Sequence, residues 1–305
     1  MPCYRPLQGY RSAERSANGG RQVVFRRKAG FSDRPIDVPC GQCIGCRLDR
    51  SREWAIRCVH EAKLYEDNCF VTLTYRDKDL PEDMSVDIRE LQLFMKRLRK
   101  KYGEGIRFFG CGEYGEKTGR PHYHVLLFNH DFSDKKLFKR TDYGDLYVSA
   151  DLERIWTKGN SSIGTVTFQS AAYTARYQMK KQRSEVFQHV YFDPETNEAM
   201  PRNPEFGTMS KIPGIGFEYV QKYWKEMIRD DYLVIDGKKM SIPRYYAKQI
   251  AVLKDLQEKD VKKLGKNRAT RVRKARRHAG NNTSGRHRVR EAVQAARASK
   301  LERKL

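Results

Sequence analysis

The stretch GIRFFGCGEYGEKTGRPHYHVLLF, residues 105–128, predicts a β-hairpin. Its two halves, residues 105–115 and 120–128, are rich in apolar and aromatic residues, and GEKTG between them carries the glycines of a tight turn. Side chains alternate between the two faces of a strand, so His122 and His124 share one face. The tyrosine, valine and leucine between and after them point to the other face, which we expect to be the core.

Glu113 lies across the predicted hairpin from these histidines. If residues 114 and 121 flank the turn, Glu113 is directly opposite His122 and on the same face. Two imidazoles about 7 Å apart and a carboxylate can converge on a metal ion and leave positions open for a substrate oxygen. The alternatives are an incidental His-x-His pair and a charge beside a turn.

Segments on both sides of the hairpin extend the pattern into an α+β sheet. We expect helices at 47–65, 87–103, 150–157 and 169–183, and further strands at 69–75 (CFVTLTY) and 163–168 (IGTVTF). The order strand, helix, hairpin, strand, helix predicts a central antiparallel β-sheet with helices on one face, of the ferredoxin or RNA-recognition type. Cys69 and Cys111 fall in strands and are expected in the core. Later residues predict a helix at 216–232, a hairpin turn at Asp236-Gly237 and a basic helical extension.

The predicted helix near 171–181, AAYTARYQMKK, places two tyrosines one turn apart. Tyr173 and Tyr177 share a face that Lys180 and Lys181 continue. Packing alone would explain such a pair. Beside a metal-bound phosphate, however, a phenol that attacks phosphorus and a lysine that stabilises charge make a phosphoryl-transfer site.

The composition indicates a polyanionic partner. The 305 residues carry a formal net charge of +23, and nucleic acid is the commonest partner for such an excess, with an anionic membrane surface as the rival. No apolar run has the length of a membrane span, and the N-terminus has no apolar signal-peptide core, so we expect an intracellular protein without a membrane partner. The absence of a GxxxxGK loop argues against an NTP-driven motor.

The block VPCGQCIGC, residues 38–46, is the other candidate metal site. Cys40, Cys43 and Cys46 follow a C-x₂-C-x₂-C spacing, which suits structural zinc with Cys3 as the fourth ligand. Cys58 and His60 compete for that fourth position. An iron–sulfur cluster or three reduced thiols are the alternatives.

Three motifs resemble those of the HUH endonucleases, in that family's order. They are the strand FVTLTY (70–75), the strand PHYHVLLF (121–128) and the helix YTARYQMKK (173–181), so the resemblance covers about residues 69 to 181. The paired tyrosines followed by lysines resemble the subgroup that runs rolling-circle replication. The flanking MPCYRPL and VPCGQCIGC resemble replication initiators of gokushovirus-like Microviridae, which are small single-stranded DNA phages.

The resemblance implies roles for the site residues. His122 and His124, with Glu113, would bind Mg²⁺ or Mn²⁺, Tyr173 and Tyr177 would be alternating nucleophiles, and Lys180 or Lys181 would assist. Attack would leave a 5′-phosphotyrosine and free a 3′-hydroxyl without ATP, and the second tyrosine would later help to close a circle. The implied partners are single-stranded and circular double-stranded phage DNA at the origin, and the host helicase and polymerase, in the host bacterial cytoplasm.

Together these features predict four segments: a Cys-rich segment and helix (1–66), a nuclease core (67–185), accessory elements (186–250) and a basic tail (251–305). A non-catalytic zinc-containing nucleic-acid-binding protein would explain the charge and the cysteines, but it would leave the histidine strand and the tyrosine pair as coincidences. A transposase or conjugative relaxase would share the chemistry and differ in its DNA substrate.

Overall fold

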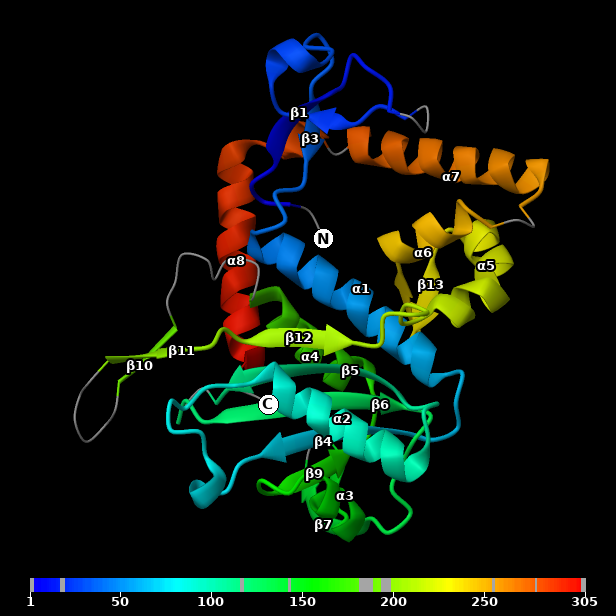
Figure 1. Ribbon diagram of the computed structural model, residues 1–305. Helices are drawn as coiled ribbons and strands as arrows, with labels where there is room; N and C mark the ends of the chain where they lie inside the picture. Colours follow the sequence, from blue (N-terminus) through cyan, green and yellow to red (C-terminus); the bar gives the residue numbers. More distant parts are fainter. Residues whose placement is uncertain are drawn as a thin grey trace. The chain divides into compact units, whose positions relative to one another are not determined.

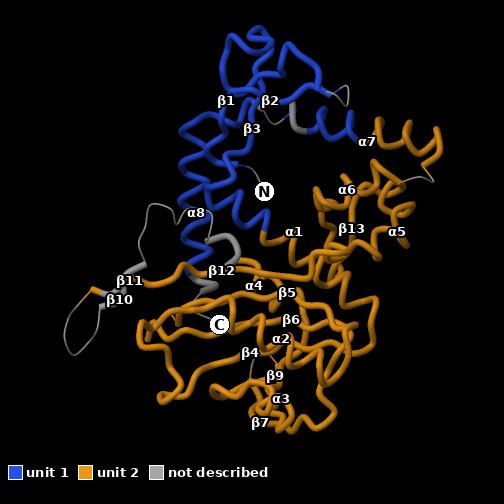
Figure 2. The backbone as a smooth tube through the Cα atoms, viewed as in Figure 1, with its two compact units in different colours: residues 1–50, 268–305 blue, residues 51–267 orange. Residues whose placement is uncertain are grey.

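The computed structural model describes residues 3–16, 20–115, 118–141, 144–180, 189–192, 199–253, 256–277 and 279–302. Its contacts divide the chain into two compact units (Figure 2). Unit 1 comprises residues 1–50 and 268–305, and unit 2 comprises residues 51–267. Two helices pass from one unit into the other, α1 (Ile44–Ala62) and α7 (Glu258–Arg277).

Unit 2 is built on a seven-stranded sheet (Figure 1). Every pairing between neighbouring strands is antiparallel. In spatial order the strands are β12 (Phe206–Met209), β5 (Arg107–Tyr114), β6 (Pro121–Phe128), β4 (Asn68–Thr74), β9 (Ser161–Gly164), β8 (Gly144–Val148) and β7 (Lys136–Thr141). The α+β class with a central antiparallel sheet is confirmed.

The β5–β6 hairpin has the register that the sequence predicts. Tyr114 pairs with Pro121, and Glu113 pairs with His122. On the other edge of β6, strand β4 pairs Thr72 with His124. These pairings fix which side chains meet on each face of the sheet.

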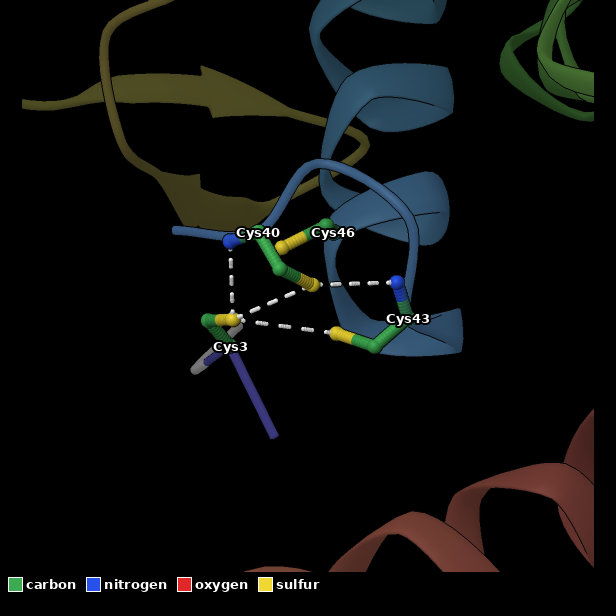
Figure 3. A group of neighbouring side chains, drawn as sticks. All are labelled: Cys3, Cys40, Cys43 and Cys46. Atoms are coloured by element: carbon green, nitrogen blue, oxygen red, sulfur yellow. Dashed lines mark hydrogen bonds between the residues drawn. The ribbon is translucent and has the colours of Figure 1, made fainter. Parts of the chain in front are cut away.

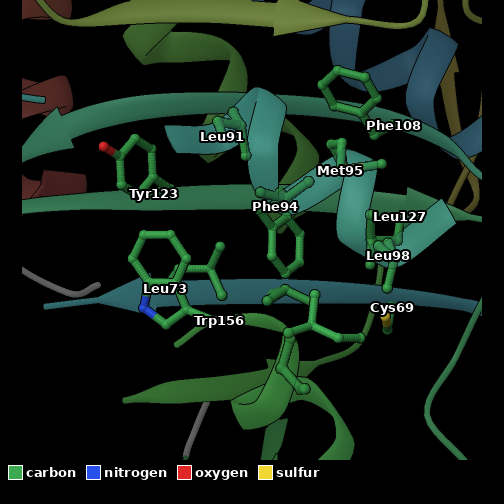
Figure 4. Close-up of a cluster of buried hydrophobic side chains, with 14 of the residues drawn as sticks. Cys69, Leu73, Leu91, Phe94, Met95, Leu98, Phe108, Tyr123, Leu127 and Trp156 are labelled. Carbon is green, nitrogen blue, oxygen red and sulfur yellow. The ribbon is translucent and has the colours of Figure 1, made fainter. Parts of the chain in front are cut away.

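One face of the sheet is covered by α2 (Ile88–Tyr102) and α3 (Ala150–Ile155), as Figure 4 shows in part. Asp87 caps α2, because its carboxylate accepts the Arg89 N–H at 2.7 Å, and Gly103 ends the helix with φ of 101°. The apolar side of α2 packs on side chains of β4 and β6 in one buried cluster, which includes Leu73, Leu91, Phe94, Met95, Leu98, Tyr123, Leu127 and Trp156. The expected helix at 87–103 is therefore confirmed, and so is the core face of β6.

Helices also cover the opposite face, where the sequence led us to expect none. Ala55 and Cys58 of α1 pack there on Phe109 and Leu126, together with Ala171 and Ala175 of α4 (Phe168–Lys180). The expectation of helices on one face was wrong because β6 ends in an apolar run that needs cover on both sides. Small residues let the helix backbones approach closely, and Ser51 Oγ donates to the Ala172 carbonyl at 2.9 Å.

The β9–α4 boundary also differs from the expectation of a strand at 163–168. Strand β9 ends at Gly164, and α4 begins four residues later. Thr167 and Ser170 bond each other's backbone N–H groups, at 3.1 Å and 2.9 Å, which sets the start of the helix. Lys181 lies outside the described residues, as do the side chains of Tyr177 and Lys180.

The remaining elements of unit 2 form a second small core around Ile56, Trp224 and Tyr246. They are α5 (Phe217–Asp230), β13 (Leu233–Ile235), β14 (Lys238–Met240) and α6 (Arg244–Ile250). The hairpin turn expected at Asp236-Gly237 is confirmed, because both residues have positive φ and join β13 to β14. Two further strands, β10 (His189–Phe192) and β11 (Ala199–Arg202), pair with each other.

Unit 1 joins both ends of the chain. It holds the sheet of β2 (Val23–Val24), β1 (Leu7–Arg11) and β3 (Ile36–Val38), the first residues of α1, and α8 (Ser284–Glu302). Arg5 Nε lies 2.9 Å from Glu291 Oε2, which ties the N-terminal segment to α8. In the described part of the chain, no helix is both long enough and apolar enough to cross a bilayer.

Candidate active site

Adjacent strands place a carboxylate and two imidazoles together. Glu113 lies on β5, His122 and His124 lie on β6, and one ligand atom from each falls within 4.8 Å of the others. Both histidines point away from the α2 face because Tyr123 between them is buried in that core. The structure thus brings together the three residues that the hairpin pattern selected.

Glu113 is the centre of the cluster. Its Oε1 atom lies 2.9 Å from His122 Nε2 and 2.9 Å from His124 Nε2. The side chain is 1% exposed, and its Oε2 atom has no hydrogen-bond partner among the described residues. A buried carboxylate oxygen without a partner costs free energy unless a cation or donor completes it.

Helix α4 adds a phenol to the same carboxylate. Tyr173 Oη donates a hydrogen bond to Glu113 Oε1 at 2.9 Å. The Tyr173 ring lies nearly perpendicular to the His124 ring, with 5.1 Å between centroids, and the Arg176 guanidinium lies 5.4 Å from the tyrosine ring. Of the four predicted residues of this helix, only Tyr173 has a described side chain.

Further contacts orient the two histidines. His122 Nδ1 lies 3.1 Å from the Arg120 carbonyl oxygen, and this contact holds the ring with Nε2 facing Glu113 Oε1. His124 Nδ1 lies 3.0 Å from Thr72 Oγ1, and the Phe70 ring stacks on His124 at 5.3 Å. No local sequence pattern marks Thr72, Phe70 or Arg120 as supporting residues. The pairing of Thr72 with His124 in the sheet would have revealed one of them.

The electrostatics of the cluster favour an ionised carboxylate. Burial raises the pKa of Glu113, but the hydrogen bonds with His122 and His124 outweigh it and lower this pKa to about 2. For His122, burial lowers the pKa, but the contact with Glu113 outweighs it and the pKa is raised. For His124, burial dominates and its pKa is lowered. The site therefore holds a fixed negative charge beside imidazole nitrogens.

These residues fit a divalent metal ion. Two imidazole nitrogens and one carboxylate are a common donor set for such ions. The unpartnered Oε2 atom of Glu113 is a buried acceptor that a cation would satisfy. The geometry therefore suits a divalent metal ion held by Glu113, His122 and His124.

The cysteines form a second group of this kind, in unit 1 (Figure 3). Cys3 Sγ lies 3.6 Å from Cys40 Sγ and 3.9 Å from Cys43 Sγ, and the Sγ atom of Cys46 also belongs to the group. Backbone N–H groups point at these sulfurs: Cys40 N–H reaches Cys3 Sγ at 3.2 Å, and Tyr4 N–H reaches Cys43 Sγ at 3.3 Å. Burial raises the pKa of Cys43, but hydrogen bonds from the backbone N–H groups of Tyr4 and Cys46 and from neighbouring thiols outweigh it and lower the pKa to about 7.

The two competitors for the fourth position lie elsewhere. Cys58 is buried against the sheet of unit 2. His60 is buried beside Tyr246 Oη, 3.2 Å from its Nδ1 atom, and stacks on Tyr219. Of these candidates, Cys3 is the residue that the structure brings to the other three cysteines.

The amino-acid sequence is similar to those of phage replication proteins. A family model described as replication-associated protein ORF2/G2P matches residues 68–182. The chain is 36% identical over 256 residues to the replication-associated protein VP4 of Bdellovibrio phage phiMH2K, which covers 81% of this chain and 76% of that protein. It is 31% identical to the replication-associated protein ORF2 of Spiroplasma virus 4 over 278 residues. This match covers 82% of this chain and 80% of that protein.

A third relative is the replication-associated protein ORF4 of Chlamydia phage 1. The identity is 30% over 220 residues, which span 68% of this chain and 52% of that protein. No solved structure matches the chain. The matched residues of the family model include the whole cluster around Glu113 and helix α4.

Proposed function

The chain belongs to the family of phage replication-associated proteins, and we propose that it initiates rolling-circle replication by nicking single-stranded origin DNA with a tyrosine. One observation carries the proposal. The Tyr173 hydroxyl is held by the same carboxylate oxygen of Glu113 that contacts both His122 and His124. A phenol fixed at a candidate metal site is what phosphoryl transfer to tyrosine needs, because a phenol at its ordinary pKa near 10 is a weak nucleophile.

The chemistry is a transfer of the phosphoryl group from DNA to the protein. The Tyr173 oxygen attacks the scissile phosphorus, a tyrosyl O–P bond forms, and the bond from phosphorus to the 3′ oxygen breaks. The phenol loses its proton and the departing 3′ oxygen gains one, so the products are a 5′-phosphotyrosine and a 3′-hydroxyl. Because one phosphoester replaces another, the step needs no ATP.

Glu113, His122 and His124 would hold the divalent metal, Mg²⁺ or Mn²⁺. Such an ion supplies Lewis-acid polarisation of the phosphate when bound. Thr72 and the Arg120 carbonyl fix the orientation of the two imidazoles.

Tyr177 would be the second nucleophile of the same helix. It follows Tyr173 by one turn of α4, so it would lie on the same face. One tyrosine would keep the 5′ end of the displaced strand while the other cuts the regenerated origin, and the freed 3′-hydroxyl would close the circle. Lys180 or Lys181 would stabilise the charge that develops on the phosphate.

The cysteine group would hold a structural zinc ion. A tetrahedral ion with Zn–S bonds of about 2.3 Å places its sulfurs about 3.8 Å apart. The observed Sγ–Sγ distances of 3.6 and 3.9 Å lie on either side of that value. In the cell the substrates would be single-stranded and circular double-stranded phage DNA in the host cytoplasm, where a host helicase and polymerase would extend the 3′-hydroxyl.

The test is formation of a covalent adduct. Purified protein is incubated with single-stranded oligonucleotides that tile the phage genome, with Mn²⁺ or Mg²⁺, and the products are resolved by denaturing electrophoresis. We expect a DNA-linked protein band that is lost in His122→Ala and His124→Ala, while DNA binding persists because it rests on distributed basic residues. Imidazole ligands suit Mn²⁺ at least as well as Mg²⁺, so cutting with Mn²⁺ should be equal or faster.

Tyrosine variants complete the test. Tyr173→Phe and Tyr177→Phe should each form some adduct and fail to sustain circle production, and the double variant should form none. Tyr65→Phe, a half-buried tyrosine outside the site, is the matched control. Full cleavage by the double histidine variant in chelator, or an adduct in the double phenylalanine variant, would show that the proposed mechanism is wrong.

A further inference from the structure

The positive charge of the chain is concentrated in unit 1. This unit has less than a third of the residues, yet it carries 23 of the 61 lysines and arginines and only 6 of the 38 acidic residues. Its formal charge is therefore +17, out of +23 for the whole chain. Unit 2, which contains the candidate active site, is left with +6. The two units thus differ in their attraction for a polyanion.

Unit 1 has little hydrophobic core of its own. Among its described residues, the buried apolar side chains are Tyr4, Tyr10, Cys43 and Cys46. In contrast, several of its large apolar side chains are exposed, including Phe25 at 57% and Phe31 at 41%, and Leu7, Val23, Val272, Val289 and Val293. So small a core does not stabilise a unit of this size without a metal ion or another crosslink.

The cysteine group is the available crosslink. It joins Cys3, near one end of the chain, to the three cysteines at the start of α1. The buried cluster of unit 1 consists of these cysteines with Tyr4 and Ile44. Most of the described core of unit 1 is therefore the metal site itself.

The same group is linked to the basic helix α8 through the N-terminal segment. Tyr4 N–H bonds Cys43 Sγ, and the next residue, Arg5, pairs with Glu291 of α8 at 2.9 Å. Helix α8 exposes Arg286, Arg288 and Arg297. Ordering residues 3–5 at the cysteines thus places Arg5 where it pairs with the helix that carries these guanidinium groups.

We propose that unit 1 is a module for binding double-stranded DNA, which a zinc ion on Cys3, Cys40, Cys43 and Cys46 folds and which contacts backbone phosphates through the exposed arginines of α8. The inference rests on the zinc assignment made above and does not depend on the nicking reaction. It separates two tasks: unit 1 holds the duplex, and unit 2 takes the single strand to be cut.

The charge pattern favours a duplex over a single strand. A duplex carries one charge per about 1.7 Å of axis. Each phosphate that the protein neutralises changes the slope of log affinity against log salt concentration by about 0.9 for a duplex and by about 0.7 for a single strand. Helix α8 contains no Phe, Tyr or Trp, and its one imidazole, His287, is buried, so the helix offers no exposed ring on which an unpaired base could stack. Its arginines therefore contact phosphates without reading bases.

The first arm of the test removes a zinc ligand. Full-length Cys3→Ser should lose its zinc, from about one ion per chain by elemental analysis. It should show faster proteolysis in unit 1 and bind a 30-base-pair duplex about tenfold more weakly, because the module must then order on binding. Cys58→Ala, which removes a buried thiol of unit 2, should keep both the zinc and the affinity.

The second arm removes charges. In Arg288→Gln with Arg297→Gln, the slope of log affinity against log salt should fall by about 1 to 2, measured by fluorescence anisotropy with the duplex. The matched control is Lys139→Gln with Arg140→Gln, two exposed cations of β7 in unit 2, which should leave the slope unchanged. Protein with unit 1 unaltered should bind the duplex more tightly than a single strand of the same sequence.

Three results would overturn the proposal: no zinc in the wild-type protein, unchanged duplex affinity in Cys3→Ser, or equal or tighter binding of the single strand. All binding is measured in Tyr173→Phe protein without Mg²⁺ or Mn²⁺. Failure of the nicking mechanism would leave these results intact, and failure of this module would leave the adduct assay intact.

Discussion

Replacing Glu113 by glutamine tests the centre of the candidate site. The substitution keeps the shape of the side chain and removes its charge. In the folded protein the carboxylate is 1% exposed and its Oε1 atom faces two imidazoles and a phenol, each at 2.9 Å. The glutamine amide would offer the two imidazoles and the phenol a neutral oxygen, and its N–H₂ group cannot accept a hydrogen bond.

Two independent estimates give the size of the effect in metal-free protein. Hydrogen bonds to a charged group contribute about 1 kcal/mol more than neutral ones, so three of them predict a loss of about 3 kcal/mol. The pKa of Glu113 falls from 4.5 to about 2 on folding, since the histidine hydrogen bonds outweigh the opposing effect of burial. At about 1.4 kcal/mol per unit this gives roughly the same 3 kcal/mol.

The pH dependence has a definite sign. Because folding lowers this pKa, its stabilisation is complete above pH 4.5 and is lost as the pH falls toward 2. The free energies of unfolding of wild type and Glu113→Gln should therefore differ by about 3 kcal/mol at pH 7 and by less than half as much at pH 3. Urea denaturation in chelator at a series of pH values measures this difference.

The control is Glu53→Gln, which removes a carboxylate from the more exposed pair with Arg244. It should cost less than about 1 kcal/mol at either pH. A loss below about 1 kcal/mol for Glu113→Gln at pH 7, or a loss that does not shrink in acid, would refute the geometry on which the estimate rests.

Three further perturbations follow from the contacts. Thr72→Val removes the hydroxyl that lies beside His124 Nδ1 and orients that ring, so the affinity for Mn²⁺ should fall about 10- to 100-fold. Calorimetric titration measures this affinity, and an unchanged value would contradict the orienting role of Thr72. Burial lowers the pKa of His60 to about 3, so below pH 6.5 the unfolded state takes up a proton that the folded state does not. The free energy of unfolding should therefore drop by about 2 kcal/mol between pH 6.5 and 4.5, and His60→Asn should abolish this contribution. Phe94→Ala removes a fully buried ring between α2 and the sheet, so the free energy of unfolding, measured by urea denaturation, should fall by about 3 to 5 kcal/mol. A loss below about 2 kcal/mol would mean that α2 does not pack as described.

The sequence predicts the hairpin, and the grouping of Glu113 with the two histidines, because local rules determine them. Strand alternation and a short turn fix the pairing of Glu113 with His122, and that register was confirmed. Helix α2 begins after Asp87 and ends before Gly103, and both residues are visible as capping signals. Tyr173 reaches the cluster because the helix follows β9, a strand of the same sheet.

The errors arise where distant segments determine the structure. The apolar run at the end of β6 needs cover on both faces, and no local pattern says that α1 and α4 provide it. The link from Arg5 to Glu291 joins residues 286 positions apart, so the sequence gives no sign that the two chain ends form one unit. The role of Thr72 depends on its partner across β4 and β6, which only the register reveals.

The most direct test of the account is to map the residue that becomes linked to DNA. Wild-type protein is allowed a single turnover on a single-stranded oligonucleotide that it cleaves, and the adduct is digested and sequenced by mass spectrometry. The account predicts a nucleotide on the Oη atom of Tyr173, because this phenol already lies at the carboxylate that holds both histidines. Attachment at a residue outside α4, at Tyr177 alone, or at no residue would contradict it.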